Sequence, residues 1–224
     1  GARVELHRIS AKRGDILLLE EQDSVAESLG DHDADLLMGR VAAASRTIAY
    51  LSDETWRHID RDLADELSVE IDVDGLSLVD NELVIVGDPS ADPLLVLHAA
   101  VTAMRSGLPL ARQSLRLLAE RQSDLPDPWP QGARDLFVEL LSGGHRAIPV
   151  IESLDYFEVW THLLPEWTPN RSRPQRNVYH RFTVDRHLLE TVAEAARLTQ
   201  RVRRPDLLLV AALLHDIVKG YPCD

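Results

Sequence analysis

The sequence lacks several features that would each point to a definite class of protein. It holds one cysteine, Cys223, among 224 residues, which excludes an intramolecular disulfide framework and is typical of a reducing compartment. It has no long apolar span and no signal peptide, so we expect a cytoplasmic protein with no membrane partner. Basic residues are fewer than acidic ones, with 24 Lys and Arg against 37 Asp and Glu, which gives a net charge of -13. Because such a surface repels phosphates, the charge argues against a general nucleic-acid or anionic-membrane partner.

The motifs of nucleotide transfer are missing as well. One kind of nucleotidyltransferase needs a Gly-Ser pair at the start of a helix and two carboxylates one residue apart on a strand to hold Mg²⁺. Asp33 with Asp35, and Asp72 with Asp74, have the carboxylate spacing, but the sequence contains no Gly-Ser. It also has no phosphate-cradling Gly-rich loop and no supported Ser-His-Asp arrangement. We therefore expect no nucleotide transfer from these residues.

What the sequence does contain is a succession of helical patterns. Hydrophobic residues make up 45% and charged residues 27%, which describes a globular protein of one or two domains. Apolar residues recur at three- and four-residue spacings along most of the chain. Beyond two short helices within residues 1–29, we expect helices at 33–50, from Ser52 onward, and at 94–106, 110–120, 133–141, 148–164, 187–198 and 205–220. The expected fold class is mainly α.

The range 33–50 predicts the longest of the early helices. Asp33 or Asp35 can cap or favour its positive N-terminal end. Ser52 has the character of an N-cap, so a separate helix is expected to begin there, with Trp56 as a core anchor. The predicted buried stripe of the first helix consists of Leu36, Leu37, Val41, Ala44, Ile48 and Ala49.

One segment changes from a helical to an alternating pattern. Between Leu67 and Val86, apolar residues alternate with polar ones, beginning at Val69. Asp80 and Asn81 form a turn signal between two apolar runs. A small β-hairpin is the expected result.

A His-Asp pair inside an apolar run is the strongest chemical signal. Leu207–Leu214 is unbroken apolar sequence, Pro205 sits where a helix can start and Gly220 where one can stop, so we predict one buried helix. His215 and Asp216 lie within it, and an ionised Asp in apolar surroundings is costly unless a cation or hydrogen-bond donors compensate it. A divalent metal would satisfy both residues. A His at the edge of the core, beside an Asp bonded to an Arg or a backbone amide, is an equally good interpretation of these two residues alone.

His187 supplies a third candidate ligand. It opens an amphipathic stretch, and a short polar connection, 200–204, then leads to the His-Asp helix. The two helices are therefore predicted to be antiparallel neighbours. In that arrangement His187 can approach His215 and Asp216.

This pattern resembles the HD-domain metal-dependent phosphohydrolases. Their pattern is a His on one helix, a His-Asp pair on a later helix and a distal Asp, and the first three positions match His187, His215 and Asp216. Lys219 matches the Lys that often follows the pair and faces the substrate phosphate. The resemblance implies a divalent metal, Mg or Mn, held by the three matching residues, and a catalytic role for Lys219.

A more specific resemblance is to the bifunctional PII uridylyltransferase/uridylyl-removing enzymes. The strings 173–177, 180–187 and 213–217 are similar to the entrance of their HD domain, and residues 3–26 and 43–57 to the segment that follows their nucleotidyltransferase domain. The family carries a nucleotidyltransferase domain, a helical segment, an HD domain and two ACT domains, in that order. The resemblance implies a helical bundle-like connector with one small hairpin at residues 1–170, followed by the first helices of an all-α HD domain at 171–224.

The same resemblance implies a function. The chain would be a fragment of a nitrogen-sensing enzyme that transfers UMP from UTP to the PII signalling protein and removes UMP from it by metal-assisted hydrolysis. Glutamine would act as effector through ACT domains absent here. The distal Asp ligand would lie beyond residue 224, so residues 1–224 alone are expected to show neither UMP transfer nor efficient UMP removal, unless Asp185 or Asp224 completes the site.

A basic cluster precedes the candidate site. Its members are Arg171, Arg173, Arg176, Arg181 and Arg186. Guanidinium groups bind phosphate in a bidentate manner, so this cluster is expected to face a phosphorylated substrate, with Arg181 as the candidate substrate-binding residue. The alternative is a solvated surface.

Two other functions fit the same residues. One is an HD-type phosphohydrolase acting on free nucleotides, which a substrate panel with and without PII distinguishes. The other is a non-catalytic helical scaffold, which the absence of metal binding would favour.

Overall fold

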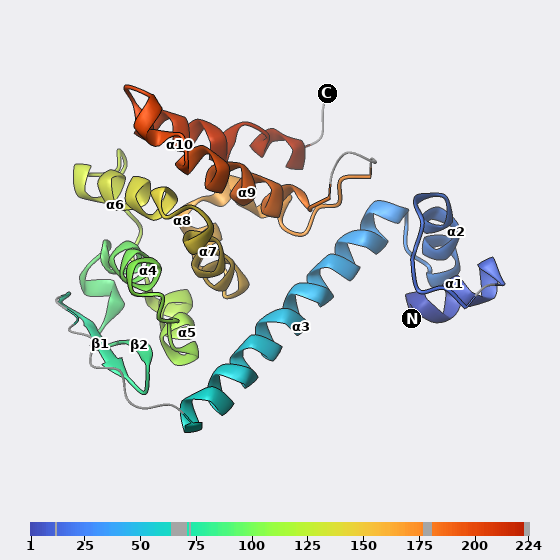
Figure 1. Ribbon diagram of the computed structural model, residues 1–224, viewed down its shortest axis with the longest axis horizontal. Helices are drawn as coiled ribbons and strands as arrows, with labels where there is room; N and C mark the ends of the chain where they lie inside the picture. The colour runs from blue at the N-terminus through green and yellow to red at the C-terminus, as the bar shows by residue number, and fades with distance from the viewer. Residues whose placement is uncertain (12, 64–70, 72, 177–180, 222–224) are drawn as a thin grey trace.

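The computed structural model describes residues 1–11, 13–63, 71, 73–176 and 181–221, which are mainly helical (Figure 1). The α-helices are α1 (Ala2–Ser10), α2 (Leu19–Leu29), α3 (Ala34–Leu63), α4 (Leu95–Ser106), α5 (Arg112–Arg121), α6 (Gln131–Ser142), α7 (Ala147–Tyr156), α8 (Val159–Leu163), α9 (Val184–Ala196) and α10 (Pro205–Leu214). Short 3-10 helices are η1 (Pro89–Ala91), η2 (Gly144–Arg146), η3 (Pro165–Asn170), η4 (Thr199–Arg201) and η5 (Ile217–Gly220). The prediction of a mainly α fold is confirmed.

The predicted hairpin is present. Strands β1 (Leu76–Val79) and β2 (Glu82–Ile85) pair antiparallel, with Leu76 opposite Ile85. Asp80 and Asn81 have φ of 51° and 61°, the left-handed conformation that a tight two-residue hairpin turn requires and that Asp and Asn tolerate. The predicted contribution of Val69 lies outside the described residues, as does Asp72.

Two hydrophobic cores organise the described chain. A small core joins α1, α2 and the start of α3 through Leu6, Val25, Ala26, Ala34 and Leu37. A large core joins the hairpin to helices α4–α10. Since α9 and α10 are part of the large core, the candidate site is fixed to the same packed body as the hairpin and helices α4–α8.

The helix α3 differs from the prediction. It runs without interruption from Ala34 to Leu63, so Ser52 lies inside a helix rather than at its start. Trp56 is not a core anchor, because 60% of its surface is exposed. Of the predicted stripe, Leu37 is buried and Val41 partly buried, whereas Leu36, Ala44, Ile48 and Ala49 are exposed. The physical reason is visible in Figure 1, in which α3 crosses the molecule as a long diagonal helix set apart from the main body.

Other helices also differ from the predicted bounds, by a few residues in α6 and α9 and by more in two cases. The stretch 148–164 is divided between α7 and α8, because Glu158 adopts a left-handed conformation with φ of 65°. The predicted helix 205–220 ends at Leu214, and η5 follows after Asp216. Nor is α10 buried on all sides: Leu209 and Leu213 are buried, whereas 56% of the surface of Leu207 is exposed. None of the helices in the described ranges is long and apolar enough to cross a membrane.

The contrast between two tryptophans tests this description of the core. Trp160 is fully buried, with its ring stacked on Phe137 at 5.7 Å and edge-on to Trp167 at 6.2 Å between centroids. We expect Trp160→Ala to lower the free energy of unfolding by about 3–5 kcal/mol, because it leaves a cavity. Trp56→Ala is the matched control, with an expected change within about 0.5 kcal/mol. Urea denaturation of both variants measures the difference, and equal losses would contradict the surface position of Trp56.

Candidate metal centre

Helices α9 and α10 create the candidate site by packing side by side (Figure 1). The connection between them is short and includes η4. Buried residues of both helices, Leu188 and Val192 on α9 and Leu209 and Leu213 on α10, belong to the large core. The prediction that these helices are neighbours is confirmed.

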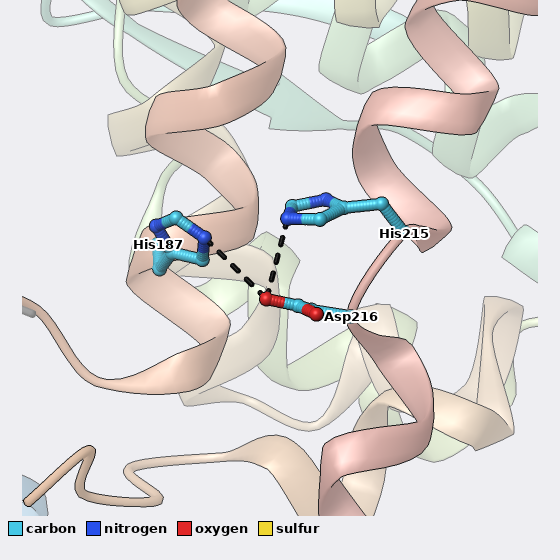
Figure 2. Close-up of side chains that lie close together, drawn as sticks. All are labelled: His187, His215 and Asp216. Carbon is cyan, nitrogen blue, oxygen red and sulfur yellow. Dashed lines mark ion pairs between the residues drawn. The ribbon is translucent and has the colours of Figure 1, made fainter.

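The three predicted ligands converge where the helices meet (Figure 2). His187 comes from the first turns of α9, and His215 and Asp216 directly follow α10. The Oδ2 atom of Asp216 lies 3.6 Å from Nε2 of His187 and 3.3 Å from Nε2 of His215. The imidazole centroids are 5.3 Å apart, with the rings inclined at 68°.

The backbone after α10 explains how adjacent residues reach one point. His215 still has helical dihedral angles, whereas Asp216 has φ of -120° and ψ of 12°. This departure from the helix turns the carboxylate toward the imidazoles. A continuous α-helix would separate the directions of the two side chains by about 100°, so the end of the helix is part of the site.

A backbone contact selects the tautomer of His215. Its Nδ1 atom lies 2.8 Å from the carbonyl oxygen of Ala212, so we assign the Nδ1–H as donor. In the neutral imidazole, Nε2, which faces Asp216, then carries the lone pair. A neutral imidazole with Nε2 as ligand is the form in which His binds a metal.

Lys219 occupies the edge of the same cluster. Its Nζ lies 2.6 Å from Oδ2 of Asp216 and donates to Oε1 of Gln175 at 3.1 Å. Partial burial raises the pKa of Asp216, but the hydrogen bond from Lys219 and the nearby positive charge outweigh it, so the pKa lies below its ordinary value. The carboxylate is therefore held in its ionised form, the form that binds a cation.

A buried asparagine holds η5 in place, and the sequence did not single it out. Asn170 has no exposed surface, and its Nδ2 donates to the carbonyl of Ile217 at 2.8 Å. Gly220 packs directly on it, since a Cβ at this position would lie 2.9 Å from the Asn170 amide and from the backbone of Pro169. Arg173 adds a hydrogen bond to the carbonyl of Gly220 at 3.2 Å. These contacts fix the segment that carries Lys219.

The donor set fits a divalent cation. One possible ligand atom from each of His187, His215 and Asp216 lies within 4.8 Å of the others. In the described ranges, these three form the group of His, Cys, Asp or Glu side chains that is close enough to share a metal ion. Two imidazole nitrogens and a carboxylate oxygen suit several divalent metals. Asp185 is not placed to complete the set, because it is buried and bonded to Arg46 and to the Ser172 amide. Asp224 lies outside the described residues, as does Cys223.

The basic cluster is largely used inside the protein. Four of its arginines have intramolecular partners: Arg171 pairs with Asp155, Arg173 with the Gly220 carbonyl, Arg176 with Asp23, and Arg186 with Glu152. Arg181 is exposed, with its guanidinium carbon 5.5 Å from the centroid of the Phe182 ring. A substrate contact of Arg181 stays a prediction.

Comparisons with known proteins agree with the geometry of the site. Residues 184–224 match the HD domain family. The chain is 43% identical to a protein of Streptomyces coelicolor and 40% identical to one of Mycobacterium tuberculosis, in both cases over 99% of this chain and 29% of the relative. A protein of Xanthomonas campestris pv. campestris is 29% identical over 97% of this chain and 28% of its own length. Each of the three is named bifunctional uridylyltransferase/uridylyl-removing enzyme. No solved structure matches.

The extent of the match matters for its meaning. The chain spans less than a third of the length of these relatives. Of its own residues, however, 99% are included in each alignment. The HD match includes all three converging residues. Along nearly its whole length the chain is therefore similar to a segment of proteins named bifunctional uridylyltransferase/uridylyl-removing enzyme, and the end of that segment, residues 184–224, matches the HD domain family.

Proposed function

We propose that this chain carries part of the uridylyl-removing site of a bifunctional enzyme that adds UMP to the PII signalling protein and removes it. The observation that supports this most is the convergence of His187, His215 and Asp216 within a segment similar to proteins named uridylyl-removing enzymes. The enzyme would be cytoplasmic, with residues 1–170 as a helical connector and 171–224 as the first part of the HD domain. UTP and UMP would be its nucleotides, and glutamine its effector through ACT domains.

Each residue of the site has a definite task in the proposed hydrolysis. His187, His215 and Asp216 would hold a divalent metal, Mg or Mn. Such a cation makes a water molecule more acidic and polarises a phosphoryl oxygen. Lys219, now paired with Asp216, has an ammonium group that can neutralise charge on the substrate phosphate. Arg181 is exposed and would bind the phosphorylated substrate.

Nucleotide transfer is assigned to other parts of the enzyme. The described residues include the carboxylates Asp33 and Asp35, but both are at the start of α3, and Asp33 accepts a hydrogen bond from the amide of Leu36. That is the role of a helix cap rather than of a metal ligand on a strand. The segment therefore supports removal of UMP and not its addition.

Replacing Asp216 tests the proposal directly. In an enzyme of the full length of the relatives that contains this segment, Asp216→Ala should lower removal of UMP from uridylylated PII by at least about 100-fold, because it deletes the carboxylate that the cation needs. Addition of UMP should stay within about twofold. Both rates are measured by release and incorporation of labelled UMP.

A second variant and a substrate panel give the controls. Lys219→Met should keep Mn²⁺ binding but slow removal of UMP, since Lys219 acts on the substrate rather than on the metal. If correctly folded Asp216→Ala lost addition of UMP together with removal of UMP, the assignment of the two activities to different parts of the enzyme would be refuted. Hydrolysis of free nucleotides with no effect of PII would favour the alternative of a general HD phosphohydrolase.

The packing of Gly220 on Asn170 gives a prediction for this chain alone. Gly220→Ala places a methyl group where 2.9 Å contacts leave no room, so η5 should shift and carry Lys219 and Asp216 with it. We expect the affinity for Mn²⁺ to fall about tenfold, measured by isothermal titration calorimetry. Gly132→Ala is the matched control, because its added Cβ meets only Leu94, at an ordinary 3.5 Å. Equal affinities of both variants would show that η5 does not set the geometry of the site.

A further inference from the structure

The long helix α3 meets the main body through a small number of side chains. Tyr50 stacks on Tyr156 with 4.3 Å between ring centroids, and Glu54 accepts a hydrogen bond from Arg112 at 2.8 Å. Between these contacts and the N-terminal part of α3 lies Arg46, whose side chain is 20% exposed. The position of α3 therefore depends on individual contacts rather than on a continuous apolar seam.

Cavities on both sides of Arg46 support this description. One, of about 770 Å³, lies between α3 and the segment that includes Pro169 and Pro174. Another, of about 400 Å³, lies between α3 and α7. Arg46 lines both of them. Since apolar side chains do not fill these spaces, the polar contact of Arg46 is the main attachment of α3 at this level.

Arg46 bridges two buried carboxylates from different helices. Its guanidinium donates to Oδ2 of Asp155 on α7 at 2.5 Å and to Oδ2 of Asp185 on α9. The side chains of Asp155 and Asp185 are only 3% and 1% exposed. Asp185 also accepts a hydrogen bond from the Ser172 amide at 2.6 Å. One arginine of α3 thus joins α7, α9 and the segment that leads into α9.

The charges make this bridge hard to replace. Burial disfavours the charge on Arg46, but Asp185 and Asp155 more than compensate, so the pKa of the guanidinium lies above its ordinary value. Arg171 lies 3.0 Å from Asp155 and gives it a second cation, whereas Asp185 has Arg46 as its cationic partner among the contacts described here. A buried carboxylate that loses its cation must move, take up a proton or admit water.

Asp185 lies in the first turn of α9, two residues before His187. The same turn is tied to the preceding segment by the bond from the amide of Val184 to the carbonyl of Arg173, 2.9 Å long. A shift of Asp185 therefore shifts the turn that carries His187. Because ligand distances in metal sites tolerate only tenths of an ångström, even a small shift matters there.

We propose that Arg46 is a positioning residue that couples the docking of α3 to the placement of His187 in the metal site. The coupling operates through the contact with Asp185, and its effect on metal affinity rests on the function proposed above. By thermodynamic linkage the coupling acts in both directions: docking of α3 favours metal binding, and metal binding favours docking of α3. The helix α3 is then the element through which structural changes elsewhere reach the HD site.

The test compares two arginines that attach α3 to the body. Arg46→Met removes the bridge to Asp185, and Arg112→Met removes the attachment at Glu54, which does not touch α9. We expect the affinity of the 224-residue chain for Mn²⁺ to fall at least tenfold in Arg46→Met and to stay within about twofold in Arg112→Met. Isothermal titration calorimetry gives the affinities, and circular dichroism confirms that the variants are folded.

Amide hydrogen exchange supplies a readout that needs no metal. Arg46→Met should speed exchange in the first turn of α9, whereas Arg112→Met should leave that turn unchanged.

The same measurement with metal tests the reverse direction of the coupling. In the unsubstituted chain, Mn²⁺ should slow exchange along α3, and Arg46→Met should abolish this protection. Arg46→Lys keeps the positive charge but cannot donate to both carboxylates as the guanidinium does. We expect this variant to fold and to lose part of the affinity for Mn²⁺, which keeps the test possible even if Arg46→Met does not fold.

The outcomes separate this proposal from the proposed function. Unchanged exchange in the first turn of α9 in folded Arg46→Met, or unchanged affinity for Mn²⁺ in a chain that binds it, would overturn the role of Arg46. If the unsubstituted chain does not bind Mn²⁺, the metal site on this chain is refuted. If exchange in the first turn of α9 is nevertheless faster in Arg46→Met, the structural link between α3 and α9 is supported.

Discussion

A single carboxylate oxygen, Oδ2 of Asp216, is the point on which the candidate site depends. Two imidazole nitrogens and one ammonium group lie within 3.6 Å of it. A partly buried carboxylate needs hydrogen-bond donors or positive charge close to it. A divalent cation would supply that charge, with the two imidazoles as its other ligands. The chain achieves this because α10 ends at Leu214, two residues before Asp216, which leaves the carboxylate free to turn toward His187.

The surroundings of that oxygen are fixed by two separate sets of buried contacts. On one side, Asn170 and Gly220 seat η5 by close packing and a hydrogen bond to the backbone. On the other, Asp185 secures the start of α9 through Arg46 and the Ser172 amide. Both sets include a hydrogen bond to the backbone, but close packing is added in the first set and a buried ion pair in the second. The second set includes Arg46 of α3, and through this contact the proposed coupling would connect the long helix to the site.

Local signals in the sequence predicted some features and not others. The turn at Asp80 and Asn81, the pairing of α9 with α10 and the convergence of His187 with the His-Asp pair follow from short-range patterns, and the structure bears them out. Ser52 was wrongly interpreted as a helix start, because the residue types of an N-cap also occur inside a helix. Trp56 was predicted to be a core anchor, but among the described residues α3 joins a core at its start, far from Trp56. The bonds of Arg46 span 109 and 139 residues, and no local pattern encodes contacts at such separation.

The central claim is that His187, His215 and Asp216 hold a divalent cation. Diffraction from crystals of the chain grown with Mn²⁺, recorded at the manganese absorption edge, tests it most directly. The account predicts one anomalous peak roughly 2.0–2.3 Å from an imidazole nitrogen of each histidine and from an oxygen of Asp216. Crystals that show no peak there, with Lys219 still bound to Asp216 at saturating Mn²⁺, would contradict it.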